Sequence, residues 1–113
     1  MNNHETKNFL NQVVLEGIIS SEVRIFEIDN SKNAEFYFLS RFSRKDSEEK
    51  IKVIFWKADR YLHVLKKDNH LLIIGELQKD KHVNKKGEKV NTFKISANYV
   101  QEIFKPLFLE LPI

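Results

Sequence analysis

Residues 51–77 decide the fold, and they read IKVIFWKADRYLHVLKKDNHLLIIGEL. Positions 51–56 alternate between two faces, which is the period of an extended strand. From 58 to 67 the apolar spacing changes to that of a short helix, which closes on two lysines. The run 70–77 is again apolar and extended, with a glycine near its centre. The stretch therefore predicts a strand, one short helix and a further strand.

The sequence on either side of this stretch is dense in β-branched and aromatic residues. Residues 13–19 predict a first strand, in which Gly17 indicates a bulge or sharp bend, and 23–28 leads into or forms the next. Residues 34–42 predict a strong strand, whose phenylalanines at alternate positions share one face. The last strand is 90–100, and a polar hairpin tip precedes it.

Five strands with a helix between the third and the fourth are the layout of an OB-fold barrel. We therefore predict an all-β protein, a five-stranded OB-fold barrel with one short helix between strands 3 and 4. The barrel should span 10–103, after a flexible polar tail at 1–9. An apolar C-terminal extension, 104–113, should pack along the barrel or a subunit interface, unless its end at 110–113 docks a partner.

Length and composition bound the class of protein. The 113 residues are enough for a single domain, and there is no apolar run of the length that spans a membrane. The chain has no cysteine and therefore no disulfide or thiolate metal site. Its polar beginning lacks the features of a signal peptide. These features favour a soluble, intracellular protein in the cytoplasm, and the net charge of +3 gives a mild basic bias.

Short signatures in a fixed order give the chain a family resemblance. They are 11–17 (NQVVLEG), 34–40, 51–56, 65–67 with 72–77, and 85–89. Together they resemble the bacterial single-stranded-DNA-binding proteins over roughly 11–103. The resemblance implies an OB fold, single-stranded DNA as ligand, pairing of barrels into dimers or tetramers, and contacts with replication or recombination proteins.

The chain departs from this family in two features, and both limit how closely it is expected to follow the family's function. Family members carry several stacking tryptophans, and this chain has one tryptophan. They also end in a long acidic tail, whereas this chain ends soon after its barrel, so it resembles a tailless variant. A primosomal replication protein, whose barrel binds mainly other proteins, is the second resemblance, and an RNA-binding OB protein is a further alternative.

The strand at 50–56 presents cations and a ring on one side. A barrel interior takes its uninterrupted apolar side, so the residues between should point outward. These are Lys50, Lys52 and Trp56. Binding without sequence preference needs cations for the phosphates and rings for the bases, and by resemblance Trp56 stacks on a base. The alternative is that Trp56 caps the barrel or packs on the helix while Lys52 is merely solvated.

Two further groups complete the predicted interface. Phe42 and Arg44 follow the previous strand, where burial of Phe42 is the rival interpretation, and Tyr37 should face outward to meet a base or a neighbouring subunit. The hairpin carries a local basic excess, from Lys79, Lys81, His82, Lys85, Lys86 and Lys89. By resemblance, His82 replaces a stacking tryptophan and offers a smaller ring. An ordinary solvated hairpin is the alternative here.

The sequence does not predict an enzyme, a cofactor or a metal. Its four histidines show no ligand spacing with one another or with carboxylates. There is no glycine-rich phosphate loop and no nucleophile elbow. An acidic group at 46–49 is better explained as a solvated loop than as an acid–base pair.

Overall fold

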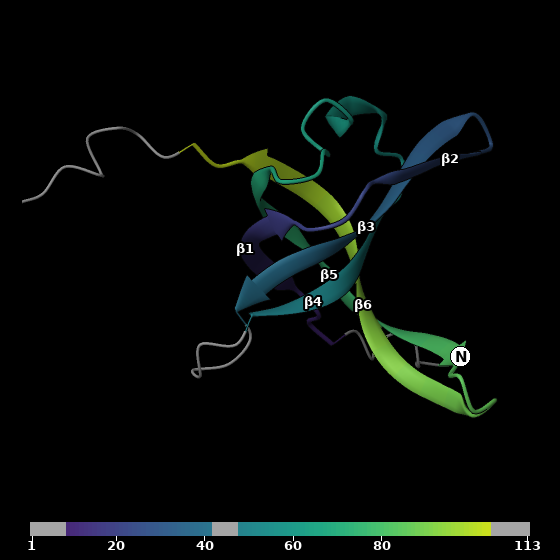
Figure 1. Ribbon diagram of the computed structural model, residues 1–113. Coiled ribbons are helices and arrows are strands. Elements are labelled where there is room, and N and C mark those ends of the chain that lie inside the picture. Colours follow the sequence, from purple (N-terminus) through teal and green to yellow (C-terminus); the bar gives the residue numbers. More distant parts are fainter. Residues whose placement is uncertain (1–8, 42–47, 105–113) are drawn as a thin grey trace, which may run out of the picture.

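The computed structural model describes residues 9–41 and 48–104 (Figure 1). In these two ranges the chain forms a barrel of β-strands with a single turn of 3-10 helix. The elements are β1 (Val13–Ile19), β2 (Arg24–Ile28), β3 (Ser31–Arg41), β4 (Glu48–Phe55), η2 (Asp59–Tyr61), β5 (His70–Val83) and β6 (Lys89–Glu102). The predicted all-β barrel is confirmed. It gains a sixth strand because the segment expected to lead into or form the next strand makes β2 by itself.

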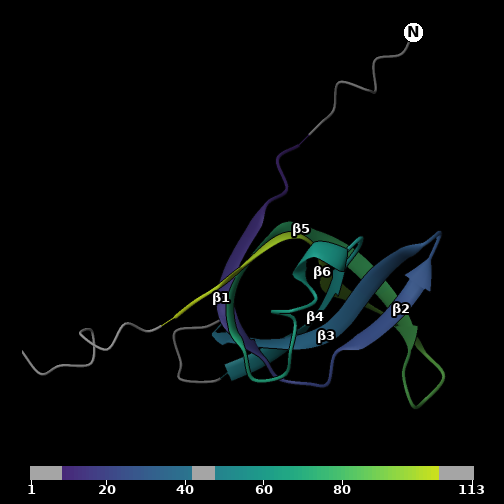
Figure 2. The ribbon, with the colours of Figure 1, turned by 90° about the horizontal axis from the view of Figure 1, so that it is seen from above.

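The strands form one sheet that closes on itself. Its order is β1-β5-β6-β4-β3-β2, and the end of β1 also pairs with β3, where Ile18 lies opposite Leu39. Figure 2 looks into the resulting ring. The last strand, β6, lies between β5, to which it is antiparallel, and β4, to which it is parallel. Closure leaves β2 at the end of the order, paired with β3.

The core fills the ring because inward positions alternate with outward ones along each strand. Phe36 and Phe38 of β3 are fully buried, as the alternation predicted, and Val53 and Phe55 of β4 face them from the neighbouring strand. Ile73 of β5 completes the ring of large apolar residues that have no exposed surface. The inner face of β4 is therefore the apolar side that the sequence indicated.

Close backbone approach explains the two glycines in the strands. A Cβ at Gly17 would meet the backbone oxygen of Leu39 and lie 2.9 Å from the ring of Phe38. The β1–β5 register runs without interruption through Gly17, so this residue marks the point where β3 comes close to β1, not a bulge. A register shift does occur beside Gly75, where β6 crosses β5 closely.

The short helix predicted over 58–67 is only the single 3-10 turn η2. The segment is held at both ends, since the N–H groups of Ala58 and Asp68 donate to carbonyls of β3 and β1 at 2.7 and 2.8 Å. Between these ends Val64 and Leu65 are buried in the core. Successive tight turns, in place of the predicted regular helix, connect these positions.

Two hairpins extend from the barrel (Figure 1). The β2–β3 hairpin turns through Asp29 and Asn30, which have φ of 52° and 66°, the left-handed values of a two-residue turn. The β5–β6 hairpin has the predicted tip, where the side chain of Asn84 accepts from the N–H groups of Lys86 and Glu88. Among the residues that the structure describes, no helix has the length and apolar character needed to cross a membrane.

Candidate nucleic-acid interface

The outward side of β4 carries the residues from which the site is built. The positions opposite the buried ones are Lys50, Lys52 and Ile54, and Trp56 follows the strand on the same side. Trp56 is 44% exposed, but Ile54 is only 5% exposed and lies outside the main core cluster. Four strand residues span about 13 Å, so Lys52 and Trp56 form two separate positions along one line.

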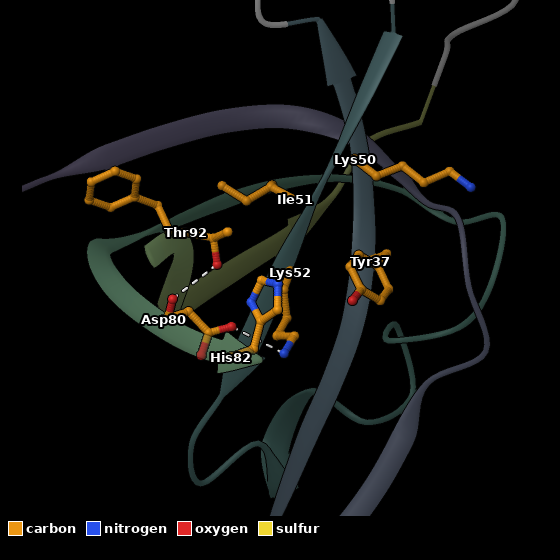
Figure 3. A pocket seen from close by; sticks show the side chains of 8 residues that line it. Tyr37, Lys50, Ile51, Lys52, Asp80, His82 and Thr92 are labelled. Atoms are coloured by element: carbon orange, nitrogen blue, oxygen red, sulfur yellow. Dashed lines mark hydrogen bonds and ion pairs between the residues drawn. The ribbon is translucent and has the colours of Figure 1, made fainter. Parts of the chain in front are cut away.

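The first position is a hollow of about 320 Å³ on the barrel surface (Figure 3). Residues of β3, β4, β5 and β6 line it, namely Tyr37, Lys50, Ile51, Lys52, Asp80, His82, Thr92 and Phe93. The structure therefore brings together four of the residues predicted for the interface: Tyr37, Lys50, Lys52 and His82. Tyr37 lies directly opposite Lys52 in the β3–β4 pairing and is exposed.

Asp80 is the acidic member of this hollow. Its Oδ2 lies 3.2 Å from Lys52 Nζ, and its Oδ1 lies 3.7 Å from Lys94 Nζ. The hydrogen bond from Lys52 holds the pKa of the Asp80 carboxyl below its usual value. The same hydrogen bond raises the pKa of Lys52. Both groups therefore stay charged around neutral pH. The Asp80 carboxylate lies between the ammonium groups of Lys52, which lines the hollow, and Lys94.

The second position surrounds Trp56. It is a hollow of about 450 Å³, lined by Ile28, Asp29, Ser31, Asn33, Trp56 and Lys57. The Trp56 ring stands edge-on to Phe26 of β2, with 6.0 Å between the ring centroids. Trp56 thus packs on the β2–β3 hairpin and keeps nearly half of its surface free for another ring.

A cation steadies the ring on which Trp56 packs. The Arg24 guanidinium lies 4.5 Å from the centroid of Phe26. Its Nε and Nη2 both donate to one oxygen of Glu35, at 3.0 and 2.9 Å. Arg24, Phe26 and Glu35 were not among the residues predicted for the site. Their alternation was visible, but their place beside Trp56 depends on the pairing of β2 with β3.

The basic residues of the hairpin do not form one surface. His82 lies on the same side of β5 as Asp80, whereas Lys79 and Lys81 alternate to the other side. The remaining three, Lys85, Lys86 and Lys89, lie at the tip or at the start of β6 and are exposed. The division of these basic residues between the two sides of β5 could have been predicted from the sequence. Counting residues outward from the Asn84 tip gives the register of the hairpin, in which Asp80 pairs with Thr92.

Several sequence expectations concern residues whose placement is not given. Phe42, Arg44 and all of the C-terminal extension except Phe104 lie outside the described residues. Within the described ranges, no group of histidine, cysteine or carboxylate side chains is arranged to hold a metal ion.

The fold defines the class of the protein, which is an OB-fold barrel. Its outer face carries the two hollows around Lys52 and Trp56. No family model matches the chain, and no curated protein matches it in sequence. Many solved structures share the fold, and two of them are described here. A Plasmodium falciparum SSB in complex with ssDNA is 18% identical at a TM-score of 0.71, and the match covers 92% of this chain and 100% of that chain.

The second similar structure is Rim1, a mitochondrial single-stranded DNA binding protein from S. cerevisiae. It is 9% identical at a TM-score of 0.66, and the match covers 85% of this chain and 97% of that chain. At these identities the likeness establishes the fold. What the barrel binds has to be argued from its own residues.

Proposed function

We propose that this chain binds single-stranded DNA with little sequence preference, along the outward side of β4. The observation that carries the proposal is the row formed by the cationic, ring-containing hollow around Lys52 and the exposed Trp56 further along the same side. Lysines attract phosphates, and rings of Tyr37 and Trp56 offer faces on which bases stack. The two similar structures are of proteins described as binding single-stranded DNA, which supports this ligand.

Tolerance of sequence follows from the kind of contact available. Every base has a face that stacks on a ring, and every nucleotide has the same phosphate. Single strands are exposed during replication, repair, recombination and mobile-element transfer, and we place the protein in these processes in an accessory role. The presence of one tryptophan and of a carboxylate within the cationic hollow supports an interaction of moderate strength.

A titration with oligo-dT tests the proposal directly. The chain has one tryptophan, so its fluorescence reports on Trp56 alone. We expect quenching at low salt, and about two engaged lysines should make the logarithm of the affinity fall with the logarithm of salt at a slope of about −1.4. The length of oligo-dT at saturation gives the site size.

Two controls separate the alternatives in this titration. Polyphosphate should compete for the cations without quenching Trp56, because it has no bases. A matched RNA oligomer that binds more tightly than DNA would reassign the ligand to RNA. If no oligonucleotide binds at low salt, the proposed function is wrong and a barrel that binds protein partners becomes the better hypothesis.

We also propose that two copies of the chain associate through the outer face of β1, β5 and β6. The strand register places an apolar patch there, consisting of Val14, Ile18, Leu72, Ile74 and Tyr99. A hydrogen bond between His70 Nε2 and Glu16 Oε2, 2.6 Å apart, lies within the patch and offers a polar contact to a second copy. The same surface on both copies can meet about a two-fold axis.

Replacing Val14 with lysine should convert such a dimer to a monomer, because it brings a charge into the apolar contact. Val14 is 53% exposed in the single chain, so the fold should tolerate the change. Sedimentation velocity measures the result. Val83→Lys is the matched control, since Val83 is 63% exposed near the tip of the β5–β6 hairpin and its replacement should leave the mass unchanged. A wild-type protein that is monomeric at tens of micromolar would contradict the proposed association.

A further inference from the structure

Asp80 lies between two lysines of the proposed interface, at a position where a phosphate of the ligand could bind. Its two carboxylate oxygens point to two different cations, Lys52 Nζ at 3.2 Å and Lys94 Nζ at 3.7 Å. A phosphate carries two free oxygens and would make the same pair of contacts. Figure 3 shows the Asp80 carboxylate directed at Lys52, and His82 and Tyr37 line the same hollow.

The carboxylate is held in this place by the hairpin. Asp80 pairs with Thr92 across the β5–β6 ladder, and the Thr92 hydroxyl donates to the Asp80 backbone oxygen at 3.0 Å. Lys52 and Lys94 are brought beside each other by the parallel pairing of β4 with β6. Three strands thus converge on one ion-pair cluster whose side chains are each less than one-third exposed.

We propose that Asp80 is an internal competitor of the DNA phosphate. In the free protein its carboxylate takes the place of a phosphate on the two lysines, and the DNA phosphate must displace this carboxylate in order to bind. This inference rests on the proposed function and adds a determinant of affinity to it. Single phosphate groups compete poorly with a tethered carboxylate. A polyanion that also stacks on rings elsewhere on the surface can displace it. Asp80 would therefore select polynucleotides over mononucleotides and free phosphate.

The competitor role makes an unusual prediction, that removing a residue of the site strengthens binding. Asp80→Asn retains the shape of the side chain and the backbone contact with Thr92 but removes the charge. We expect oligo-dT to bind about tenfold more tightly at 50 mM salt, because two lysines are released for phosphates. The salt slope should become steeper by about 1.4, so the advantage should shrink about sevenfold between 50 and 200 mM.

The contrary role for Asp80 is to position the two lysines for DNA. In that case Asp80→Asn would weaken binding, or leave it unchanged, and the inference would be overturned. Asp68→Asn is the matched control, since it removes the same charge from an exposed position that lies outside the hollow. A gain of equal size in Asp68→Asn would reduce the effect to net charge and would also overturn the inference.

Two further measurements keep the test decisive. The gain from Asp80→Asn should fall in a Lys52→Gln background, because one of the released cations is then missing. Asp80→Ser serves as a second variant if the circular dichroism melting curve shows that the asparagine variant is unfolded. A wild-type protein that binds while neither Asp80 variant binds more tightly refutes this inference alone, whereas no binding by any of them refutes the proposed function.

Discussion

Trp56→Ala is expected to weaken binding of oligo-dT by about 5- to 150-fold, which corresponds to the loss of stacking on one base. Trp56 offers nearly half of its surface, and its place is fixed by the edge-on contact with Phe26. Fluorescence anisotropy of a labelled oligonucleotide measures the change, because the variant lacks tryptophan. At high salt the loss should exceed that of Lys52→Ala, since stacking is screened less than charge.

Trp56→Phe is the conservative control for this prediction. A phenylalanine keeps a ring in the same place and should recover most of the affinity. A purely structural role of the indole would not predict this recovery of binding. Melting curves followed by circular dichroism show whether each variant is folded. A folded Trp56→Ala variant that binds as tightly as the wild type would remove Trp56 from the interface.

Gly75→Ala is expected to have the largest effect on stability. The new Cβ would meet the backbone oxygen of Ser96 and lie 2.7 Å from the Cα of Ala97, both of them backbone atoms of β6. Backbone cannot move aside as a flexible side chain can, so the strands must separate. We expect a loss of about 3 kcal/mol in the free energy of unfolding and a fall in Tm of at least about 10 °C.

Gly87→Ala provides the comparison. Gly87 has a φ of 81°, and a Cβ there would meet nothing within 4 Å. Its cost is that of a left-handed conformation, about 1 kcal/mol. Thermal and urea unfolding of the two variants should therefore rank Gly75→Ala well below Gly87→Ala. Equal stabilities would mean that the β5–β6 crossing can relax around a methyl group.

The barrel could be predicted well from the sequence because apolar residues that face the core alternate with outward-facing residues along the strands. Phe36 and Phe38 are buried and Tyr37 is exposed, as their period indicates. The segment 58–67 was harder, because its helical spacing competes with two hydrogen-bonded ends that become visible only when β1 and β3 are in place. Local periodicity does not contain such tertiary constraints.

The site was predicted only in part, for a related reason. Lys52 and Trp56 could be placed on one side from the sequence because they lie along β4 and at its end, where alternation assigns the side. Lys94 was not found, because its place beside Lys52 depends on the parallel pairing of β4 with β6. Asp80 was visible as a charge in the hairpin, but its contact with both lysines is a consequence of three strands meeting. The pattern of residues along each strand does not indicate the register in which strands far apart in the sequence pair with one another.

The position of β6 in the sheet has a consequence for how the protein is made. The strand formed last in the sequence lies between β5 and β4, so both of these lack a neighbour until Lys89–Glu102 has left the ribosome. Up to that point the nascent chain exposes two unpaired strand edges, which are templates for pairing with other chains. The barrel can therefore close only after β6 has emerged, and its folding rate should be limited by the contacts between strands far apart in the sequence.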